Sequence, residues 1–568
     1  MNTNGRLVLG LGAACTLFVG SALGLPRVAA QAPASPRGGL AGRVTSDNGE
    51  VRGLRVKARD TVNRISYVVF TSNGRYQLSS LPPSAYDVRV FEERFDSPVV
   101  RVTVAAGTVA TADLAIKAKA PPPGQPRLVD FDELYPPSPA RDVMTKSCFP
   151  CHGPKQRGGF HGRPWNTEAD WRRHVDNMFL PNRIVSLGRP VLTDALVSPA
   201  DRERVVRYLA ENFGPKAEPR ELRLDPLVRD EKALSEALYI EYELPPNQRA
   251  AFSNGPAERG VHDVFPGRTP KTQGVIWLAG MQSGSILRLD TTILDFKSRT
   301  TEYPIRHAGN VNVQPHAIVE DHGRVYFTQL SGSAIGELDP EDGEIRSHPT
   351  PTQGARPHTL RPDSKGNLWF SNFDAGKIGR MDAATKAMTE VEPIKGKPWN
   401  GYGLIVDKRD RVWASGLTEP ALAMYDPKSD AWRTYPLSSP TRRLTEDSKG
   451  RIWACHYFGN AISMVDPETG SVTEYKLPLK NGDPYEVWAD RDDNLWVDNV
   501  VYNSLVKFDP RTKAFTYYPF PVFDGHAPKI EIDADGTLWW ANFASRPMPI
   551  IAFKPRGNAP AGQAGAAR

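Results

Sequence analysis

One sequence unit recurs through the second half of the chain, and this repeat constrains the fold more than any other feature. Each unit begins with an apolar stretch that carries an aromatic residue, continues to a hydrophobic-Asp-Pro stretch, and ends in a T-x-Y-x-hydrophobic-Pro stretch. Successive aromatic residues are 40 to 49 positions apart. A period of this length, with strands every 8–12 residues or so, predicts a β-propeller. The aromatic residues are Trp277, Tyr326, Trp369, Trp413, Trp453, Trp496 and Trp539.

The order of the repeat elements predicts how the ring closes. The third element also occurs seven times, and its first copy, at residues 240–245, precedes the first aromatic element. We therefore expect the outer strand of the last blade to come from the start of the domain, an arrangement that hides the sheet edges. The sequence predicts a seven-bladed propeller over residues 237–555.

Residues 148–152 read Cys-Phe-Pro-Cys-His, and C-x-x-C-H is the attachment sequence of a c-type haem. On a helical turn, Cys148 and Cys151 can bond the two vinyl groups while His152 reaches the iron from the same side. A redox-active cysteine pair would want a βαβ context, and a zinc site would need further ligands at ordered spacing. The sequence offers neither, so it predicts a covalently bound haem c.

The haem motif stands near the start of a helical segment, residues 128–216. Trp171, Val175 and Met178 recur at helical spacing, and Ser198-Pro199 is a typical start for a later helix. A haem-bearing first helix and an amphipathic last helix resemble a class I cytochrome c. The W-x-x-x-V-x-x-M pattern is similar to the haem domain of quinohaemoprotein amine dehydrogenases.

The sixth iron ligand is less strongly specified. Met178 is the methionine that follows the motif in this segment, and a thioether ligand raises the haem potential. A methionine on an apolar helical face is also common as a packing residue. His174 and His161 are alternative ligands, and an open sixth position is a further alternative.

The first residues of the sequence have the pattern of a secretory signal. Arg6 precedes an apolar run, and Val28-Ala29-Ala30 offers a cleavage site, which gives a signal peptide at 1–30. A retained anchor and a lipoprotein at Cys15 are the alternatives. We expect an exported, periplasmic protein with no stable membrane span after cleavage.

Cys455 remains without a partner, so we expect no intramolecular disulfide. A net charge of +6, with basic and acidic residues interspersed, gives no indication of nucleic-acid binding.

Short alternating runs separated by turn residues fill residues 39–118 and predict a small antiparallel β-sandwich. The order G-x-V, then N-G-x-Y-x-L-x-x-L-P, then Y-x-V-x-V resembles the carboxypeptidase regulatory-like domain. The resemblance implies a prealbumin-like sandwich that serves as a spacer or contacts carbohydrate. No patch of stacking aromatic residues favours the carbohydrate role. The complete prediction is a mainly β, multidomain chain: a sandwich, an α-helical class I cytochrome c-like domain and a seven-bladed propeller.

The amino-acid sequence of the propeller repeats resembles that of the streptogramin (virginiamycin B) lyases between about residues 270 and 545. The stretches that carry the resemblance are 315–318 (Pro-His-Ala-Ile), 357–360 (Pro-His-Thr-Leu), 366–370 (Gly-Asn-Leu-Trp-Phe) and 376–382 (Gly-Lys-Ile-Gly-Arg-Met-Asp). The family opens a lactone by elimination, using a base and Mg²⁺ held by a Glu-x-His element and a second Glu.

Those carboxylates are missing from the corresponding positions here. Gln314 and Arg356 stand two residues before His316 and His358. The position four after the blade aromatic offers no oxygen ligand either, so the sequence does not favour Mg²⁺. The residues at that position are Leu330, Phe373, Leu417, Tyr457, Val500 and Phe543.

Two sets of polar residues at equivalent repeat positions are expected to face the mouth of the propeller. One set lies ten or eleven residues before the blade aromatic: His316, His358, Tyr402, Arg442 and Tyr485. The other lies three residues after it: Gln329, Asn372, His456, Asn499 and Asn542. His526, after Asp524-Gly525, is similar to the first set but lies at a longer spacing from its blade aromatic, Trp539. The alternative is that these residues only satisfy loop backbone groups.

Several functions are compatible with these features. The first is an exported haem protein that transfers electrons to a periplasmic redox partner, with the propeller binding a small-molecule or carbohydrate ligand. The second is a dehydrogenase whose propeller oxidises a small molecule and passes electrons to the haem. The third is a lyase or lactonase with an accessory haem domain. The fourth is a cell-envelope scaffold or carbohydrate-binding protein.

Overall fold

The structure is a computed structural model of the 568-residue chain. It describes residues 36–121, 123–153, 167–179, 192, 194, 197–246, 259–306, 312–393, 399, 401–543 and 548–556. The predicted signal peptide at 1–30, Cys15 and His161 lie outside the described residues. The fold is mainly β with few helices, and the chain from Arg37 onward forms one compact unit.

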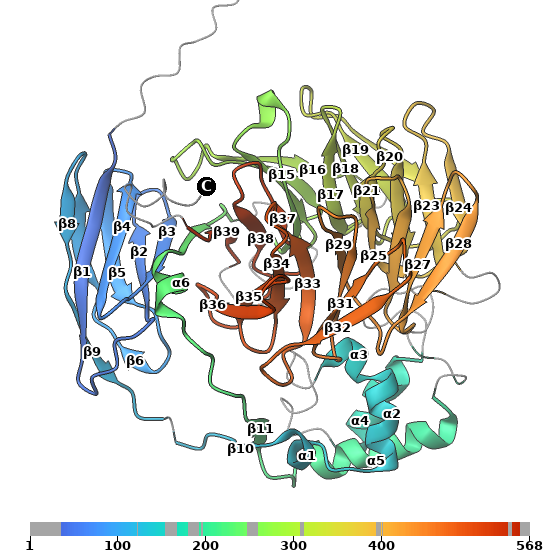
Figure 1. Ribbon diagram of the computed structural model, residues 1–568, viewed down its shortest axis with the longest axis horizontal. Helices are drawn as coiled ribbons and strands as arrows, with labels where there is room; N and C mark the ends of the chain where they lie inside the picture. The colour runs from blue at the N-terminus through green and yellow to red at the C-terminus, as the bar shows by residue number, and fades with distance from the viewer. Residues whose placement is uncertain are drawn as a thin grey trace, which may run out of the picture. The chain divides into compact units, whose positions relative to one another are not determined.

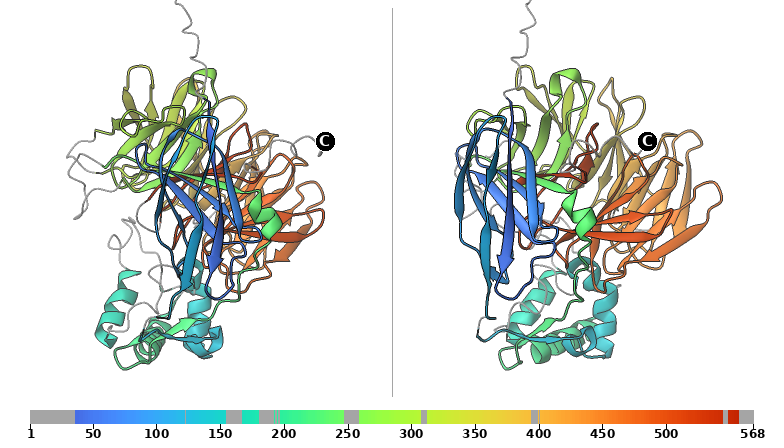
Figure 2. Two further views of the ribbon diagram at one scale, coloured as in Figure 1. Left: turned by 90° about the vertical axis from the view of Figure 1, so that its left-hand side faces the viewer. Right: turned by 60° about the vertical axis from the view of Figure 1, so that its left-hand side comes forward.

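The first part of the chain is the expected β-sandwich (Figures 1 and 2). One sheet has the strand order β4-β1-β9-β6, with β8 pairing β1, and the other contains β3-β2-β5-β7. Along β4, Tyr76 and Leu78 are buried while Gln77 between them is exposed, as the alternating sequence predicts. The strands are β1 Gly38–Ser46, β2 Arg55–Asp60, β3 Ile65–Phe70, β4 Arg75–Leu81, β5 Ser84–Val90, β6 Phe95–Asp96, β7 Val100–Val104, β8 Val109–Thr111 and β9 Leu114–Ala118.

A helical unit follows. Its helices are α1 Phe131–Leu134, α2 Pro139–Ser147, α3 Phe149–His152, α4 Glu168–Asn177 and α5 Pro199–Phe213, and two short strands, β10 Arg127–Val129 and β11 Arg220–Leu222, pair in parallel. Ser198 caps α5 by accepting a hydrogen bond from the backbone of Asp201, and Pro199 is the first helical residue, as predicted. α5 packs against both α2 and α4 around a common apolar cluster.

The propeller repeat folds into seven blades within the described residues. Six of them are separate four-stranded antiparallel sheets whose strands follow chain order. Blades one to three are β13 Val261–Pro266, β14 Val275–Gly280, β15 Ser285–Asp290, β16 Thr300–Pro304; β17 Pro315–Asp321, β18 Arg324–Gln329, β19 Ala334–Leu338, β20 Ile345–Pro349; and β21 Pro357–Pro362, β22 Leu368–Asn372, β23 Lys377–Met381, β24 Met388–Val391.

Blades four to six are β25 Gly401–Val406, β26 Val412–Gly416, β27 Ala421–Asp426, β28 Ala431–Pro436; β29 Leu444–Glu446, β30 Ile452–His456, β31 Ala461–Val465, β32 Val472–Lys476; and β33 Pro484–Ala489, β34 Leu495–Asn499, β35 Ser504–Asp509, β36 Ala514–Pro519. The first strands of neighbouring blades contact one another around the ring. These first strands surround the centre of the ring, the position of the channel in propellers, and we call this region the channel.

The ring closes as the repeat order predicts. The last blade contains β37 Glu531–Ile532, β38 Leu538–Ala541 and β39 Ile550–Lys554, and its outer strand is β12 Leu238–Tyr242 from the start of the domain. β12 also pairs with β3 of the sandwich on its other side, so sandwich and last blade share one eight-stranded sheet. This continuation was not expected from the sequence. A short helix, α6 Glu231–Ser235, leads into β12.

The repeated tryptophan has a local structural role. In five blades its indole N–H donates to the carboxylate of an aspartate six residues earlier, in the hairpin before the second strand. The same aspartate accepts hydrogen bonds from the hairpin backbone; Asp407, for example, accepts from the backbone N–H groups of Arg409 and Arg411. The pair therefore fixes the turn and the buried ring together, which explains why the aromatic position recurs.

Candidate functional site

The first strands of five blades carry a β-bulge at the same point. The register shifts between the first strand residue and the residue three positions later, so two residues of each strand stand opposite one residue of its neighbour. A bulge bends the strand and re-aims side chains. The bulged pairs are His262–Asp263, His316–Ala317, His358–Thr359, Tyr402–Gly403 and Tyr485–Glu486.

Four of the re-aimed rings form a continuous row inside the channel. The ring centroids of His262 and His316 are 3.8 Å apart, those of His316 and His358 are 4.1 Å apart, and those of His358 and Tyr402 are 4.2 Å apart. All four side chains are buried. Burial lowers the pKa of all three imidazoles, and the pKa values of His316 and His358 fall well below the usual range.

Charged groups lie beside this row. Burial opposes ionisation of Asp263, but its 2.7 Å hydrogen bond with His262 and the positive charge of Arg443 outweigh burial and lower its pKa. The Arg443 guanidinium donates to Thr359 Oγ1 at 2.9 Å and lies 3.5 Å from Glu486. Burial raises the pKa of Glu486 to about 7 despite its cationic neighbours. The channel interior is thus polar, charged and closed to bulk solvent.

The predicted mouth residues Tyr402, Arg442 and Tyr485 meet at one end of this row. The Arg442 guanidinium lies 3.9 Å from the ring centre of Tyr457 and 4.6 Å from that of Tyr485. The hydroxyls of Tyr402 and Tyr485 contact each other, and Arg442 reaches Tyr402 Oη at 3.4 Å. The mouth is therefore an arginine enclosed by three tyrosines, a group we call the tyrosine cage (Tyr402, Tyr457, Tyr485 and Arg442).

The C-x-x-C-H turn is seated on this tyrosine cage. Arg442 donates to the carbonyl oxygen of Pro150, which stands between the two cysteines, at 3.2 Å. Gly153 follows the turn with φ 61° and ψ 169°, and a Cβ there would overlap Asp483 Oδ2. Burial, and then the charge of Arg442, lower the pKa of His152. The helical unit thus presents its cysteine turn to the mouth of the channel.

The other residues of the predicted motif lie in the helical unit. Cys148 is half-buried at the end of α2, and Cys151 and His152 lie in α3. Met178 is the half-buried residue that ends α4, and its carbonyl oxygen accepts from the backbone of Leu192. His174 lies one turn earlier, with its ring 6.1 Å from that of Trp171. The sixth-ligand prediction for Met178 is not tested by these positions.

The structure brings together most of the first predicted set, whereas the members of the second set differ in their surroundings. His526 joins the mouth, with its ring 4.5 Å from Tyr485 and its Nδ1 2.6 Å from Asp498. His456, in contrast, bonds Ser439 and Ser463 and is directed along its own blade. Gln329 and Asn372 likewise donate to Ser347 and Glu390 on the outer strands of their blades. These three side chains, at the ends of second strands, bond within or beside their own blades, whereas Asn542 accepts a hydrogen bond from the backbone N–H of His526 at the mouth.

Sequence reasoning missed His262, Asp263 and Arg443. Val261-His262-Asp263-Val264 has the same apolar-His-x-apolar form as the stretch around His316. Its spacing to Trp277 is 15 residues, because the intervening hairpin contains a 3₁₀ turn at Pro270–Thr272. A search on local form instead of spacing would have found it. Arg443 follows a predicted residue, and its burial beside Thr359 and Glu486 is not indicated by the repeat spacing.

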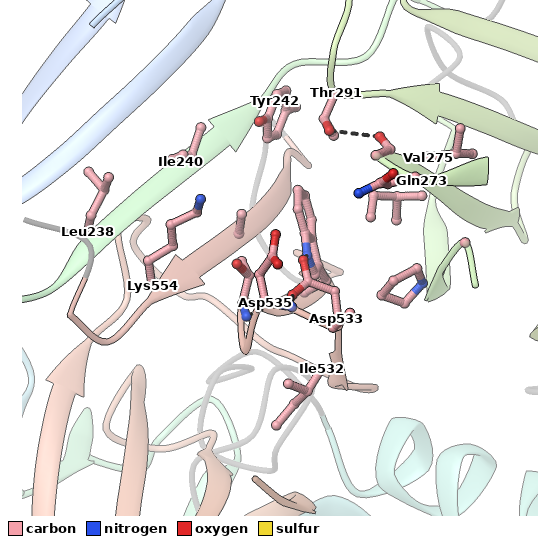
Figure 3. A pocket seen from close by; sticks show the side chains of 18 of the residues that line it. Leu238, Ile240, Tyr242, Gln273, Val275, Thr291, Ile532, Asp533, Asp535 and Lys554 are labelled. Atoms are coloured by element: carbon pink, nitrogen blue, oxygen red, sulfur yellow. Dashed lines mark hydrogen bonds between the residues drawn. The ribbon is translucent and has the colours of Figure 1, made fainter. Parts of the chain in front are cut away.

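Two cavities adjoin these elements. One, of about 450 Å³, lies beside the cysteine turn and is lined by Lys146, Pro150, Arg442, Tyr457 and Phe458 among others. The other, of about 1160 Å³, lies between the sandwich and the first and last blades. Figure 3 shows Lys554, Asp533 and Asp535 along its wall, with Thr291 bonded to the backbone across from them.

Comparison with known proteins identifies parts of the chain. Residues 39–117 match the model of the carboxypeptidase regulatory-like domain, which confirms the resemblance of the sandwich. Comparison with curated proteins finds no match. Similar solved structures include a streptogramin B lyase (17% identity, TM-score 0.48, covering 56% of this chain and 97% of that one). A virginiamycin B lyase from Staphylococcus aureus is also similar (18% identity, TM-score 0.47, covering 56% and 99%).

The helices of the described part of the chain are all too short or too polar to cross a membrane.

Proposed function

We propose that the protein is an exported c-type haem protein in which a small molecule is bound, and oxidised or reduced, in the propeller channel next to the cysteine turn. The observation that carries this proposal is the 3.2 Å bond from Arg442 to the carbonyl of Pro150 inside the C-x-x-C-H sequence. A motif for covalent haem attachment is held at the mouth of a buried, polar channel. An electron carrier at the mouth of the channel would be close enough to exchange electrons with a substrate bound in the channel.

The residue types in the helical unit are those that would hold a haem. Cys148 and Cys151 lie on adjoining helical turns, and His152 follows directly. Met178 lies at the end of a second helix of the same unit and would supply a thioether. When bound, the haem would accept or donate single electrons at its iron. The residues of the protein itself would fix the turn, exclude water and bind the ligand.

The tyrosine cage would fix the turn. One amino group of Arg442 donates a hydrogen bond to the carbonyl oxygen of Pro150, and the guanidinium lies over the ring of Tyr457. Contacts on two sides therefore fix its position. Gly153 allows the chain to leave the turn against Asp483, where any side chain would collide. The cavity of about 450 Å³ beside Lys146 and Tyr457 would admit a small ligand next to this contact. The row of neutral imidazoles deeper in the channel would bind or orient its polar groups.

A first test examines the attachment itself. We expect the purified protein to retain its haem in acid-acetone, and Cys148→Ala to lose covalent attachment at one vinyl group. Haem that extracts completely from the wild-type protein would refute this part. Replacing Met178 with Ala is expected to change the spectrum and lower the potential, whereas unchanged values would assign the sixth position elsewhere.

A second test addresses the channel. A panel of small molecules is scored by reduction of the haem band in the wild-type protein and in Arg442→Met. We expect Arg442→Met to slow reduction by at least about tenfold, because a hydrogen bond from a charged group contributes about 1.5–3 kcal/mol. Arg433→Met is the matched control, since Arg433 also lies over a tyrosine and donates to a proline carbonyl but is exposed on an outer strand.

The lyase alternative receives less support. The positions at which the lyases hold Mg²⁺ carry Gln314, Leu330 and Phe373 here. Turnover that requires Mg²⁺ and leaves the haem band unchanged would favour it over the proposal. The sandwich would serve as a spacer, because its sheet continues directly into the last blade.

A further inference from the structure

Three buried side chains in the channel, two of them from the imidazole row, form a cluster that the proposed function does not assign to a metal ion. His262 and Asp263 come from the bulge of the first blade, and His316 comes from the bulge of the second. Each offers one potential ligand atom, and these atoms all lie within 4.8 Å of one another. His262, Asp263 and His316 are 6%, 2% and 3% exposed, so the cluster is not a chance grouping of surface residues.

An independent observation points to a missing partner at this cluster. The Nδ1 atom of His316 is buried and makes no hydrogen bond of ordinary length and angle, although the backbone of His358 interacts with this imidazole. A buried polar atom without a partner is destabilising by about 1–3 kcal/mol, so such atoms usually face water, an ion or a ligand. His262 is held by Asp263 on one side and by the ring of His316 on the other, which fixes two of the three groups in place.

The composition of the cluster favours a cation. Asp263 places a carboxylate among the two imidazoles, and a carboxylate repels an anionic ligand. Arg443 and Lys529 are buried cations that also interact with Asp263, and Glu486, 3.5 Å from Arg443 Nε and 3.4 Å from Lys529 Nζ, offsets part of their charge. Imidazole and carboxylate together are the donor types that proteins use for zinc, iron and copper, whereas Mg²⁺ and Ca²⁺ prefer oxygen alone.

We propose that His262, Asp263 and His316 bind one divalent transition-metal ion in the propeller channel. Three protein ligands leave at least one coordination position for water or a substrate atom, as in catalytic metal sites. The open side would be the channel itself, where His358 is the next ring in the row. This site does not depend on haem attachment, since both blades that form it are separate from the helical unit.

The test uses the full-length protein after dialysis against a chelator, with Zn²⁺ as the probe. Equilibrium dialysis followed by elemental analysis counts zinc separately from haem iron. We expect one Zn²⁺ per wild-type chain and an affinity at least about 100-fold lower in His316→Ala, since even residues behind the ligands contribute 10–100-fold. His322→Ala is the matched control, because His322 also bonds a neighbouring aspartate at 2.7 Å but is exposed.

The outcomes separate this proposal from the haem proposal. Zinc binding by the double variant Cys148→Ala, Cys151→Ala, equal to that of the wild type, would support a site independent of haem. Should His316→Ala fold poorly by circular dichroism, Asp263→Asn, with nearly the same volume, gives the same readout. Absence of zinc from the wild type overturns the proposal, as does unchanged affinity in a folded variant. Phosphate binding without zinc binding would assign the cluster to an anion instead.

Discussion

The sandwich and the helical unit both adjoin the propeller, and they are joined to it in different ways. The sandwich shares a β-sheet with the last blade through β3 and β12, and buried side chains of both parts form one apolar cluster. The ion pair between Lys57 and Glu241 crosses this joint at 2.8 Å. In the described part of the chain, no strand of the helical unit pairs with a propeller strand. Its contacts include the Arg442–Pro150 bond and the stacked rings of Phe149 and Phe458, 5.0 Å apart.

The different contacts at the two joints indicate that the joints have different roles. A continuous sheet with buried charges resists separation, so the sandwich and the propeller should unfold together. A contact without shared strand pairing can open without unfolding either side. The first joint is structural, and the second is a docking contact whose position matters for the proposed reaction. Variants in each joint should therefore report on different events.

The largest effect is expected from Glu241→Gln. The substitution leaves the buried ammonium group of Lys57 without its charged partner, which typically costs about 3–5 kcal/mol. Burial raises the pKa of Glu241 and lowers that of Lys57, so both charges depend on each other. Urea unfolding at pH 7 measures the loss.

Glu243→Gln is the control for that measurement, because its partner Arg59 is partly exposed and the pair should contribute no more than about 1 kcal/mol. Equal losses in the two variants would contradict a buried structural joint. A sandwich signal that melts well before the propeller in the wild type would contradict it as well.

A pH dependence is expected from Glu92. Burial opposes its charge, but Arg55 and Arg229 outweigh burial and lower its pKa to about 2. The pKa of an unfolded glutamate is higher, so the stabilisation is complete above about pH 4.5 and is lost as the pH falls toward 2. The expected loss is about 3 kcal/mol, measured by urea unfolding between pH 5 and pH 2. Glu92→Gln should flatten this slope, whereas Glu50→Gln, in a half-exposed pair, should leave it unchanged.

A smaller and more local effect is expected from Gly153→Ala. Its φ and ψ lie in a region that is nearly exclusive to glycine, at a cost of about 1–3 kcal/mol for other residues, and the new methyl would meet Asp483. Hydrogen exchange should accelerate in residues 131–152 while β2 and β3 keep their protection. Gly107→Ala, also at positive φ but with open space around it, should leave the helices unaffected. Uniform acceleration across the molecule would argue against a separable docking contact.

Much of this architecture follows from local sequence patterns. The period of the aromatic residues predicts the blades because in five of them the indole is bonded to an aspartate in its own hairpin, so the signal is confined to a few residues. The closing strand follows from the order of the elements. The residues at the channel mouth were found where spacing is regular, and His262 was missed where a longer hairpin changes the spacing to Trp277.

The two joints lie beyond such patterns because each depends on surfaces far apart in the sequence. The burial of β3 has one local signal, since residues 65–70 read Ile-Ser-Tyr-Val-Val-Phe, a nearly continuous apolar run typical of strands covered on both faces, and all six are buried. From the sequence alone Glu241 would be predicted to face solvent, whereas the structure places it in an ion pair with Lys57 of the sandwich. For the cysteine turn, nothing in residues 148–152 indicates that Arg442, almost three hundred positions later, bonds the carbonyl of Pro150.

The finest test compares two stacked phenylalanine pairs, one in each joint. Phe91 and Phe523 lie 4.3 Å apart between sandwich and propeller, and Phe149 and Phe458 lie 5.0 Å apart between helical unit and propeller. Double-mutant cycles to leucine should give a coupling of about 0.5–1.5 kcal/mol for each pair. The coupling of Phe91 with Phe523 should appear in global unfolding by urea. That of Phe149 with Phe458 should appear only in the opening of the helices measured by hydrogen exchange, because that joint can separate while the propeller stays folded. If the second coupling also appeared in propeller unfolding, the helical unit would be as firmly integrated as the sandwich.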